Sequence, residues 1–166
     1  MYTEPTRQEK AANPRWLAEQ ARALLAGQTD AVANAANLSA LIYLAMEDVN
    51  WAGFYFYRDG RLLVGPFQGR PACVEIPLGK GVCGTAAEKR EVQRVADVHA
   101  FEGHIACDAD SRSEIVLPLV RDGELIGVLD IDSPLPDRFG PEEEALLLDL
   151  AEIYIQSLSA DQPGSS

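Results

Sequence analysis

The spacing of apolar residues predicts two helices in the first third of the chain. After Asn13-Pro14, a helix cap followed by a proline suited to the first turn, apolar residues recur at helical spacing until Gly27. A second helical pattern follows Asp30 and extends to Met46. This segment is rich in alanine, the residue with the highest intrinsic helix propensity. The chain therefore begins with a helical layer.

The composition then changes to aromatic and β-branched residues, which are typical of strands. Asp59-Gly60, a dipeptide common in tight hairpin turns, separates two such runs and predicts an antiparallel pair. A second hairpin is expected around Asp122-Gly123. The expected strands cover residues 51–57, 61–67, 72–76, 91–95, 114–120 and 124–132.

The remaining segments complete an α+β prediction. A glycine-rich turn at 78–84 leads into a short helix at 85–89, and a final helix begins at Pro141, where three glutamates complement the positive helix end. Residues 96–113 show neither helical nor strand periodicity, and a loop of that length in a small domain is usually functional. We expect an antiparallel sheet of about six strands with helices from both ends of the chain packed on it.

Composition limits the domain number and the partners. The 166 residues, 47% of them apolar, suit one domain, which we place at 14–158 with flexible ends at 1–13 and 159–166. The 26 acidic and 14 basic side chains give a net charge of −12, which disfavours nucleic acid and anionic membranes as partners. The N-terminus lacks a signal-like apolar run, and the odd number of cysteines disfavours a disulfide framework. These features predict a soluble, cytoplasmic protein.

Two apparent ligand motifs are weak. Gly79-x-Gly81-x-x-Gly84 matches a dinucleotide fingerprint, but the flanking pattern predicts hairpins rather than βαβ units, so a tight structural turn is the better interpretation. His99, His104 and Cys107 carry metal-ligating atoms in the long loop. Their spacing lacks a paired-ligand pattern such as CxxC, which favours an ordinary polar loop. We therefore predict neither a metal nor a cofactor.

The three cysteines allow a redox function. Cys107 lies among turn-forming residues close to Arg112, a setting that suits a thiolate better than a core position does. Cys73 falls on a predicted strand and Cys83 at the mouth of the short helix. Thiols that converge in the fold can pass from sulfenic acid to disulfide, one attacking and another resolving. The alternative is that the three are unrelated small core residues.

Asp130 and Asp132 alternate along an otherwise apolar strand, which places both carboxyl groups on one face of the sheet. Glu114, at the start of the paired strand, is positioned to join them. Like charges on one face repel, so such a group persists if one member stays protonated or if a cation is bound. The alternative is a strand end that frays into solvent at Ser133-Pro134.

These residues occur within motifs that resemble one known family, the free methionine-(R)-sulfoxide reductases, which are stand-alone GAF-domain enzymes. The resemblance runs from about Pro14 to Leu158 and includes the spacing of the three cysteines. The motifs that carry it are Asn50-Trp-Ala-Gly-Phe-Tyr55, Gly65-Pro-Phe-Gln-Gly69, Pro71-Ala-Cys73, Gly81-Val-Cys-Gly-Thr-Ala-Ala87, Gly103-His-Ile-Ala-Cys-Asp108, Ser113-Glu-Ile-Val116 and Gly127-Val-Leu-Asp-Ile-Asp-Ser-Pro134.

The resemblance implies a GAF-like fold and a role for each cysteine. Cys107 is then the attacking thiol, and Cys73 and Cys83 are candidates for the resolving thiol. It further implies a pocket lined by Trp51, Tyr55, Glu114, Asp130 and Asp132. A carboxylic acid with a raised pKa would protonate the departing sulfoxide oxygen, and we expect Glu114 and Asp132 to serve this step.

The implied reaction converts free methionine-(R)-sulfoxide to methionine and leaves a disulfide for thioredoxin or a similar thiol donor to reduce. GAF relatives are often dimers, so a homodimer is possible. The competing hypothesis is a GAF sensor that binds a small ligand or responds to oxidation without turnover. A sensor usually needs an output domain, for which 166 residues leave no room.

Overall fold

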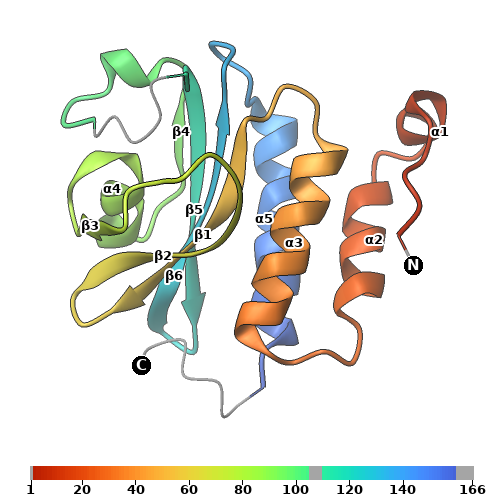
Figure 1. Cartoon of the computed structure of the whole chain (residues 1–166), viewed down its shortest axis with the longest axis horizontal. Helices are drawn as coiled ribbons and strands as arrows, with labels where there is room; N and C mark the ends of the chain where they lie inside the picture. Colours follow the sequence, from red (N-terminus) through yellow and green to blue (C-terminus); the bar gives the residue numbers. More distant parts are fainter. Residues whose placement is uncertain (1, 105–109, 160–166) are drawn as a thin grey trace.

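The computed structural model describes residues 2–104 and 110–159, which form one six-stranded sheet with helices on both faces (Figure 1). The helices are α1 (Arg7–Ala12), α2 (Trp16–Leu25), α3 (Ala31–Ala45), α4 (Gly81–Lys89) and α5 (Pro141–Ser157), with a 3₁₀ turn, η1 (Val98–Ala100). The strands are β1 (Trp51–Arg58), β2 (Arg61–Gly69), β3 (Glu75–Pro77), β4 (Gln93–Val95), β5 (Ser113–Arg121) and β6 (Glu124–Ser133). This architecture confirms the predicted α+β fold with six antiparallel strands.

The sheet has the strand order β3-β2-β1-β6-β5-β4, and every neighbouring pair is antiparallel. Both predicted hairpins form, and β1 and β6, which are far apart in sequence, lie side by side at the centre. The turn residues Asp59 and Asp122 take positive φ, as do the glycines that follow them. A left-handed backbone at both turn residues matches the twist of the strands in a two-residue hairpin, which is why each Asp-Gly dipeptide predicts a hairpin.

The two faces of the sheet are covered differently. Helices α3 and α5 pack on one face, with α2 outside them, while α4 lies on the opposite face near β3 (Figure 1). The face under α3 and α5 holds the larger buried core, in which the Phe54 and Tyr154 rings are 4.7 Å apart. The opposite face holds a second, smaller apolar cluster around α4. The sheet therefore separates a packed core from a face with a thinner cover.

Local sequence signals explain most helix boundaries. The Asp30 side chain accepts a hydrogen bond from the Ala33 amide and caps α3, and Pro141 occupies the first turn of α5. Helix α5 buries Leu147, Leu150 and Tyr154 at helical spacing, and Leu158, the residue that follows the helix, is buried as well.

The structure differs from the sequence prediction at several element boundaries. Asn13-Pro14 precedes α2 rather than capping it, because Arg15 is the N-cap and the helix begins at Trp16. Helix α1, where none was predicted, is closed by a capping box between Thr6 and Glu9. Helix α4 begins at Gly81, earlier than predicted. Strand β3 is shorter than predicted, as is β4. Of the expected end at 159–166, only Ser159 lies within the described residues.

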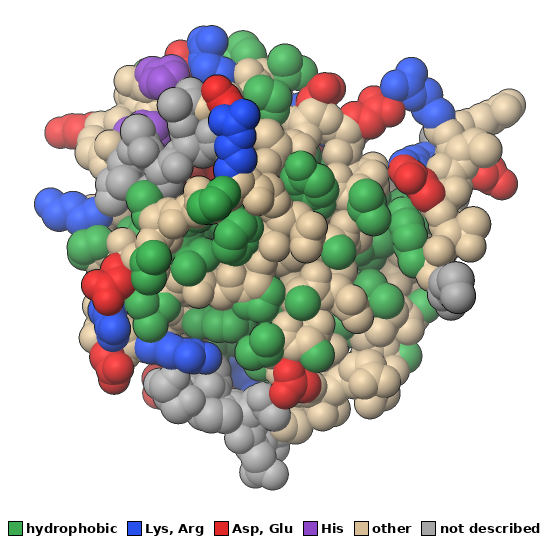
Figure 2. All heavy atoms as spheres, viewed as in Figure 1, with side chains coloured by type: hydrophobic (Ala, Val, Ile, Leu, Met, Phe, Trp, Pro, Cys, Tyr) green, Lys and Arg blue, Asp and Glu red, His purple; other side chains and the backbone are tan. Residues whose placement is uncertain are grey.

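No helix in residues 2–104 and 110–159 is both long and apolar enough to cross a membrane. On the face shown in Figure 2, acidic and basic side chains lie mostly around the rim, and hydrophobic side chains are spread across the middle. The two histidines, drawn in purple, lie at the upper left edge of this view.

Candidate active site

Three carboxyl groups meet on the face of the sheet that α4 covers. The β5–β6 register places Glu114 opposite Asp132 and Val116 opposite Asp130, so all three acids point to the same side. Glu114 and Asp132 are each 8% exposed, and Asp130 is 4% exposed. This arrangement confirms that the carboxyl groups cluster, and it excludes a frayed strand end, because β6 stays paired through Ser133.

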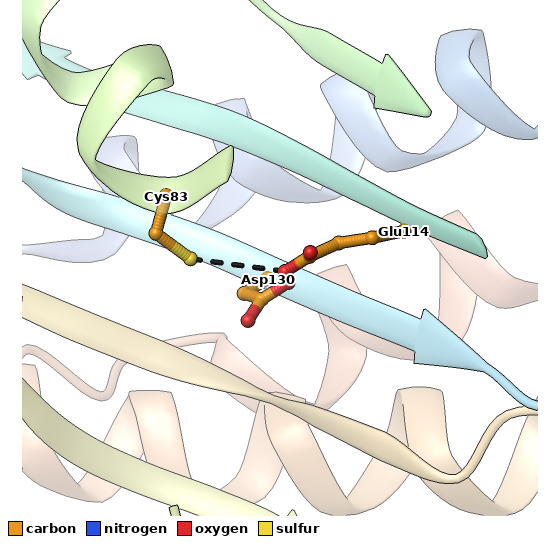
Figure 3. A group of neighbouring side chains, drawn as sticks. All are labelled: Cys83, Glu114 and Asp130. Atoms are coloured by element: carbon orange, nitrogen blue, oxygen red, sulfur yellow. Dashed lines mark hydrogen bonds between the residues drawn. The ribbon is translucent and has the colours of Figure 1, made fainter. Parts of the chain in front are cut away.

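Cys83 approaches the acids from above the sheet. It lies in the first turn of α4 and is 4% exposed. Its thiol donates a hydrogen bond to Glu114 Oε2 at 3.9 Å (Figure 3). The side chains of Cys83, Glu114 and Asp130 therefore converge from three different elements, α4, β5 and β6.

Burial controls the protonation of this group. Removal from water raises the pKa of Glu114 well above its usual value, and the neighbouring Asp130 charge raises it further. The pKa of Asp130 is also raised well above its usual value, first by burial and then by Asp132. The same burial and the nearby carboxylates raise the pKa of the Cys83 thiol. The site therefore favours a neutral Cys83 thiol and at least one protonated carboxyl group among the clustered acids.

Aromatic rings form the side wall. Trp51 pairs with Asp132 across β1 and β6, and Tyr55 follows on the same face of β1. The Trp51 ring stacks on Tyr55 at 5.7 Å and on Phe67 at 5.0 Å, and its indole N–H donates to the Arg70 carbonyl. Because both neighbours hold the indole, its face is fixed next to the carboxyl groups.

The positive end of α4 closes the other side. Gly79 and Gly81 take positive φ, and a Cβ on Gly84 would lie 2.4 Å from the Pro77 carbonyl oxygen. The glycine-rich segment is therefore the predicted structural turn, and it lets α4 begin close to the sheet. The amides of Val82 and Cys83 lie in the first turn, where a helix offers no internal acceptor, so they suit an anion.

These elements enclose a small cavity. Its volume is about 50 Å³, which is room for a few water-sized groups, and its lining includes residues of α4 and of the segment before β3. All five residues that the sequence predicted for the pocket line it, namely Trp51, Tyr55, Glu114, Asp130 and Asp132, and Cys83 joins them. Lysine and serine side chains that sequence reasoning missed, Lys80 and Ser111, also line the cavity. No periodicity or motif marks these two residues.

The cysteines have different settings. Cys73 lies in the irregular segment before β3 rather than on a strand, because β3 begins only at Glu75. It is disulfide-bonded, whereas Cys83 is a free, buried thiol. Cys107, the predicted attacking thiol, lies outside the described residues. Its role therefore stays a prediction.

Metal-ligating atoms come together in the carboxyl cluster rather than at the histidines. Within the described residues, Cys83, Glu114 and Asp130 offer ligand atoms that all lie within 4.8 Å of one another. His99 and His104 contact each other edge to face at 6.1 Å, and His104 lines the cavity without joining that group.

Comparison with known proteins places the chain in a family. The GAF domain model matches residues 15–158. The free methionine-R-sulfoxide reductase of Escherichia coli is 60% identical over 122 residues, which cover 74% of each chain. The protein of the same name from Saccharomyces cerevisiae is 45% identical over 139 residues, covering 79% of this chain and 77% of the yeast protein. This chain belongs to the GAF-domain free methionine-R-sulfoxide reductase family.

A solved member of the family supports the same assignment. The free methionine-R-sulfoxide reductase of Neisseria meningitidis, solved in complex with its substrate, superposes with a TM-score of 0.85 at 41% identity. The match covers 95% of this chain and 93% of that one. The fold and the enzyme class predicted from the sequence motifs are therefore confirmed, and this GAF domain is an enzyme of the reductase family.

Proposed function

We propose that this chain reduces free L-methionine-(R)-sulfoxide to methionine in the cavity beneath α4. One observation carries the proposal: three buried carboxyl groups and the stacked Trp51-Tyr55 pair line a single small cavity. The family relationship supports the same substrate, because the relatives are named for this reaction.

Each part of the substrate has a complementary group in the cavity. Asp130 is assigned to the substrate ammonium, and the aromatic wall of Trp51 and Tyr55 to its apolar groups. The substrate carboxylate is assigned to the first turn of α4, where amides and the nearby Lys80 favour an anion. A substrate lacking the free ammonium would leave a buried carboxyl group unpaired, so we expect the chain to prefer the free amino acid.

Cys107 is assigned the first chemical step. Its thiolate attacks the sulfoxide sulfur and forms a sulfur–sulfur bond, and the oxygen takes up a proton. The hydroxyl group then passes to the Cys107 sulfur as the sulfur–oxygen and sulfur–sulfur bonds of the intermediate break, which releases methionine and leaves a sulfenic acid on Cys107. The methionine sulfur gains the two electrons that Cys107 loses. Glu114 and Asp132 are assigned to protonate the oxygen, because both lie on the cavity wall and burial raises the pKa of Glu114.

Cys73 is assigned the resolving step. Its thiol attacks the sulfenic sulfur of Cys107, water leaves, and a disulfide forms. Two observations favour Cys73 over Cys83. Cys73 already forms a disulfide, while Cys83 is buried beside three acids that hold its thiol in the neutral, poorly nucleophilic form. Thioredoxin or a similar dithiol then returns both cysteines to the reduced state.

The test is continuous turnover with the separated R and S diastereomers of free methionine sulfoxide. NADPH oxidation is followed in the presence of thioredoxin and its reductase. The proposal expects sustained NADPH consumption and stoichiometric methionine with the R form, and little of either with the S form. Consumption limited to one equivalent per protein would instead indicate a redox sensor, and equal rates with both diastereomers would contradict the assigned site.

A further inference from the structure

The Cys83 thiol and the carboxyl groups of Glu114 and Asp130 together offer three metal-ligand atoms, and the proposed reaction does not require them to act together. Cys83 Sγ and carboxyl oxygens of Glu114 and Asp130 lie within 4.8 Å of one another (Figure 3). They come from α4, β5 and β6, which the sheet register and the helix packing hold in place. A single ion of ordinary metal–ligand distance would need only small side-chain adjustments to contact all three.

An unsatisfied atom in the same cluster points to a ligand. Asp130 is 4% exposed, and its Oδ1 atom has no hydrogen-bond partner within the described residues. A buried carboxylate oxygen without a donor is costly, because the water it has lost is not replaced. Asp130 lines the cavity, so a cation entering there would supply the missing partner.

The donor set selects the kind of cation. One thiolate with two carboxylates suits Zn²⁺ and related thiophilic divalent ions, which accept both sulfur and oxygen at four-coordinate sites. Mg²⁺ and Ca²⁺ prefer oxygen alone and a larger number of ligands. Three protein ligands and an open position toward the cavity are the arrangement of an accessible rather than a closed metal site.

We propose that the reduced protein binds one Zn²⁺ ion through Cys83, Glu114 and Asp130, and that the bound ion excludes the substrate. Binding displaces the thiol proton and any carboxyl proton, and no electrons are transferred. The inhibitory part rests on the proposed function, because Glu114 and Asp130 are the groups assigned there to the substrate. Zinc availability would then control the activity reversibly.

Binding is measured first, without substrate. Reduced protein stripped of metal with a chelator is titrated with Cd²⁺, a thiophilic substitute whose thiolate complexes absorb in the ultraviolet, and Zn²⁺ is measured by competition with a chromophoric chelator. The wild type should bind one ion and develop the thiolate–metal band. Cys83→Ser should lose that band, and its affinity for Zn²⁺ should fall at least about 100-fold, since even outer-shell partners of a metal are worth 10- to 100-fold.

Two matched variants control for the thiol and the carboxylate. Cys73→Ser removes a thiol outside the cluster, and Glu124→Gln removes an exposed carboxylate on β6, so both should keep the band and the affinity. Asp130→Asn should keep the band but weaken binding, which provides a second test if Cys83→Ser does not fold. A band that persists in Cys83→Ser, or wild-type affinity in Asp130→Asn, would overturn the site.

Inhibition is measured separately. Zn²⁺ should lower the initial rate of sulfoxide reduction at concentrations that match the binding curve, and a chelator should restore the rate. Full activity with the site saturated would overturn the inhibitory role. Stoichiometric binding by a protein that reduces no methionine sulfoxide would refute the proposed function and leave the metal site standing.

Discussion

Cys73 and Cys83 differ in surroundings more than in sequence context. Cys73 is half-buried in an irregular segment and disulfide-bonded, while Cys83 is enclosed by α4 and three acids. A thiol must ionise to attack, and burial next to negative charge opposes ionisation. The environment of each side chain therefore assigns different chemistry to residues of the same type.

The first prediction separates the three thiols. Cys107→Ser should abolish methionine release even in a single turnover, because an alcohol supplies almost no nucleophilic anion near neutral pH. Cys73→Ser should release one methionine per protein and then stop with thioredoxin as donor, whereas Cys83→Ser should continue to turn over. Quenched single-turnover measurement of methionine without reductant tests this, and a full burst from Cys107→Ser would refute the assignment.

The second prediction concerns the carboxyl groups. Removing a positioned acid costs about 10² to 10⁴ in rate, so Glu114→Gln and Asp132→Asn should each slow single-turnover methionine release by roughly that factor. Asp130→Asn should act mainly on KM, because its assigned partner is the substrate ammonium. The measurement is the single-turnover rate against substrate concentration from pH 5 to 9. Wild-type rates in all three variants would make these acids scaffold residues.

At the scale of elements, periodicity predicted the hairpins and long helices but not the short connections. Strand alternation placed Asp130 and Asp132 on one face, and pairing within the hairpin brought Glu114 to them. Helix α1 was missed because its signal is a capping box without an apolar stripe. Cys73 was placed on a strand because local composition cannot reveal that pairing with β2 begins only at Glu75.

The contacts that assemble the site from distant segments were equally invisible in the sequence. Phe67 supports Trp51 through a contact between neighbouring strands, and Ser111 reaches the cavity from the long segment before β5. Such contacts depend on tertiary packing rather than on local propensity. The family motifs predicted which residues line the cavity. The distances and orientations among those residues follow only from the folded structure.

The third prediction is that the stability of the fold depends on pH through Glu114, which lies on β5. The pKa of Glu114 is higher in the folded protein than in the unfolded chain, so the folded state holds a proton that the unfolded chain has released. This contribution to stability is fully present below the unfolded pKa of about 4.3 and is lost as the pH rises through the folded value. The unfolding free energy should therefore fall toward alkaline pH, by up to about 1.4 kcal/mol per pH unit for each proton.

Glu114→Gln should flatten that slope because glutamine does not titrate. Glu124→Gln, which removes an exposed carboxylate on the paired strand, is the matched control and should keep the wild-type slope. Urea unfolding at several pH values, with a chelator present, measures both variants. Equal slopes in wild type and Glu114→Gln would contradict the raised pKa.

The fourth prediction compares two neighbouring leucines of α5. Leu147 is fully buried against the sheet, whereas Leu148 is 42% exposed. Leu147→Ala should lower the unfolding free energy by about 2–5 kcal/mol, the cost of a core cavity. Leu148→Ala should change it by less than about 1 kcal/mol, because an exposed side chain loses little burial on truncation. Comparable losses in the two variants would show that α5 packs in another register.

At the scale of the whole molecule, the two faces of the sheet have different roles: one stabilises the fold and the other holds the site. The face covered by α3 and α5, with α2 packed outside them, buries the large apolar core, while the face under α4 holds acids, a free thiol and a cavity. Groups that repel one another in a buried site destabilise the fold, and the packed core on the opposite face offsets that cost. The residues of the site can therefore be arranged for binding and chemistry.

The most direct test of this account compares free L-methionine-(R)-sulfoxide with its N-acetyl derivative, using the same enzyme preparation and thioredoxin system. The acetyl group removes the ammonium and leaves the sulfoxide unchanged, so a site built to pair a buried carboxylate with that ammonium should reject it. We predict that kcat/KM falls by about 10⁴-fold on acetylation. Comparable kcat/KM for the two compounds would contradict the assignment of the buried carboxyl cluster to the free amino acid.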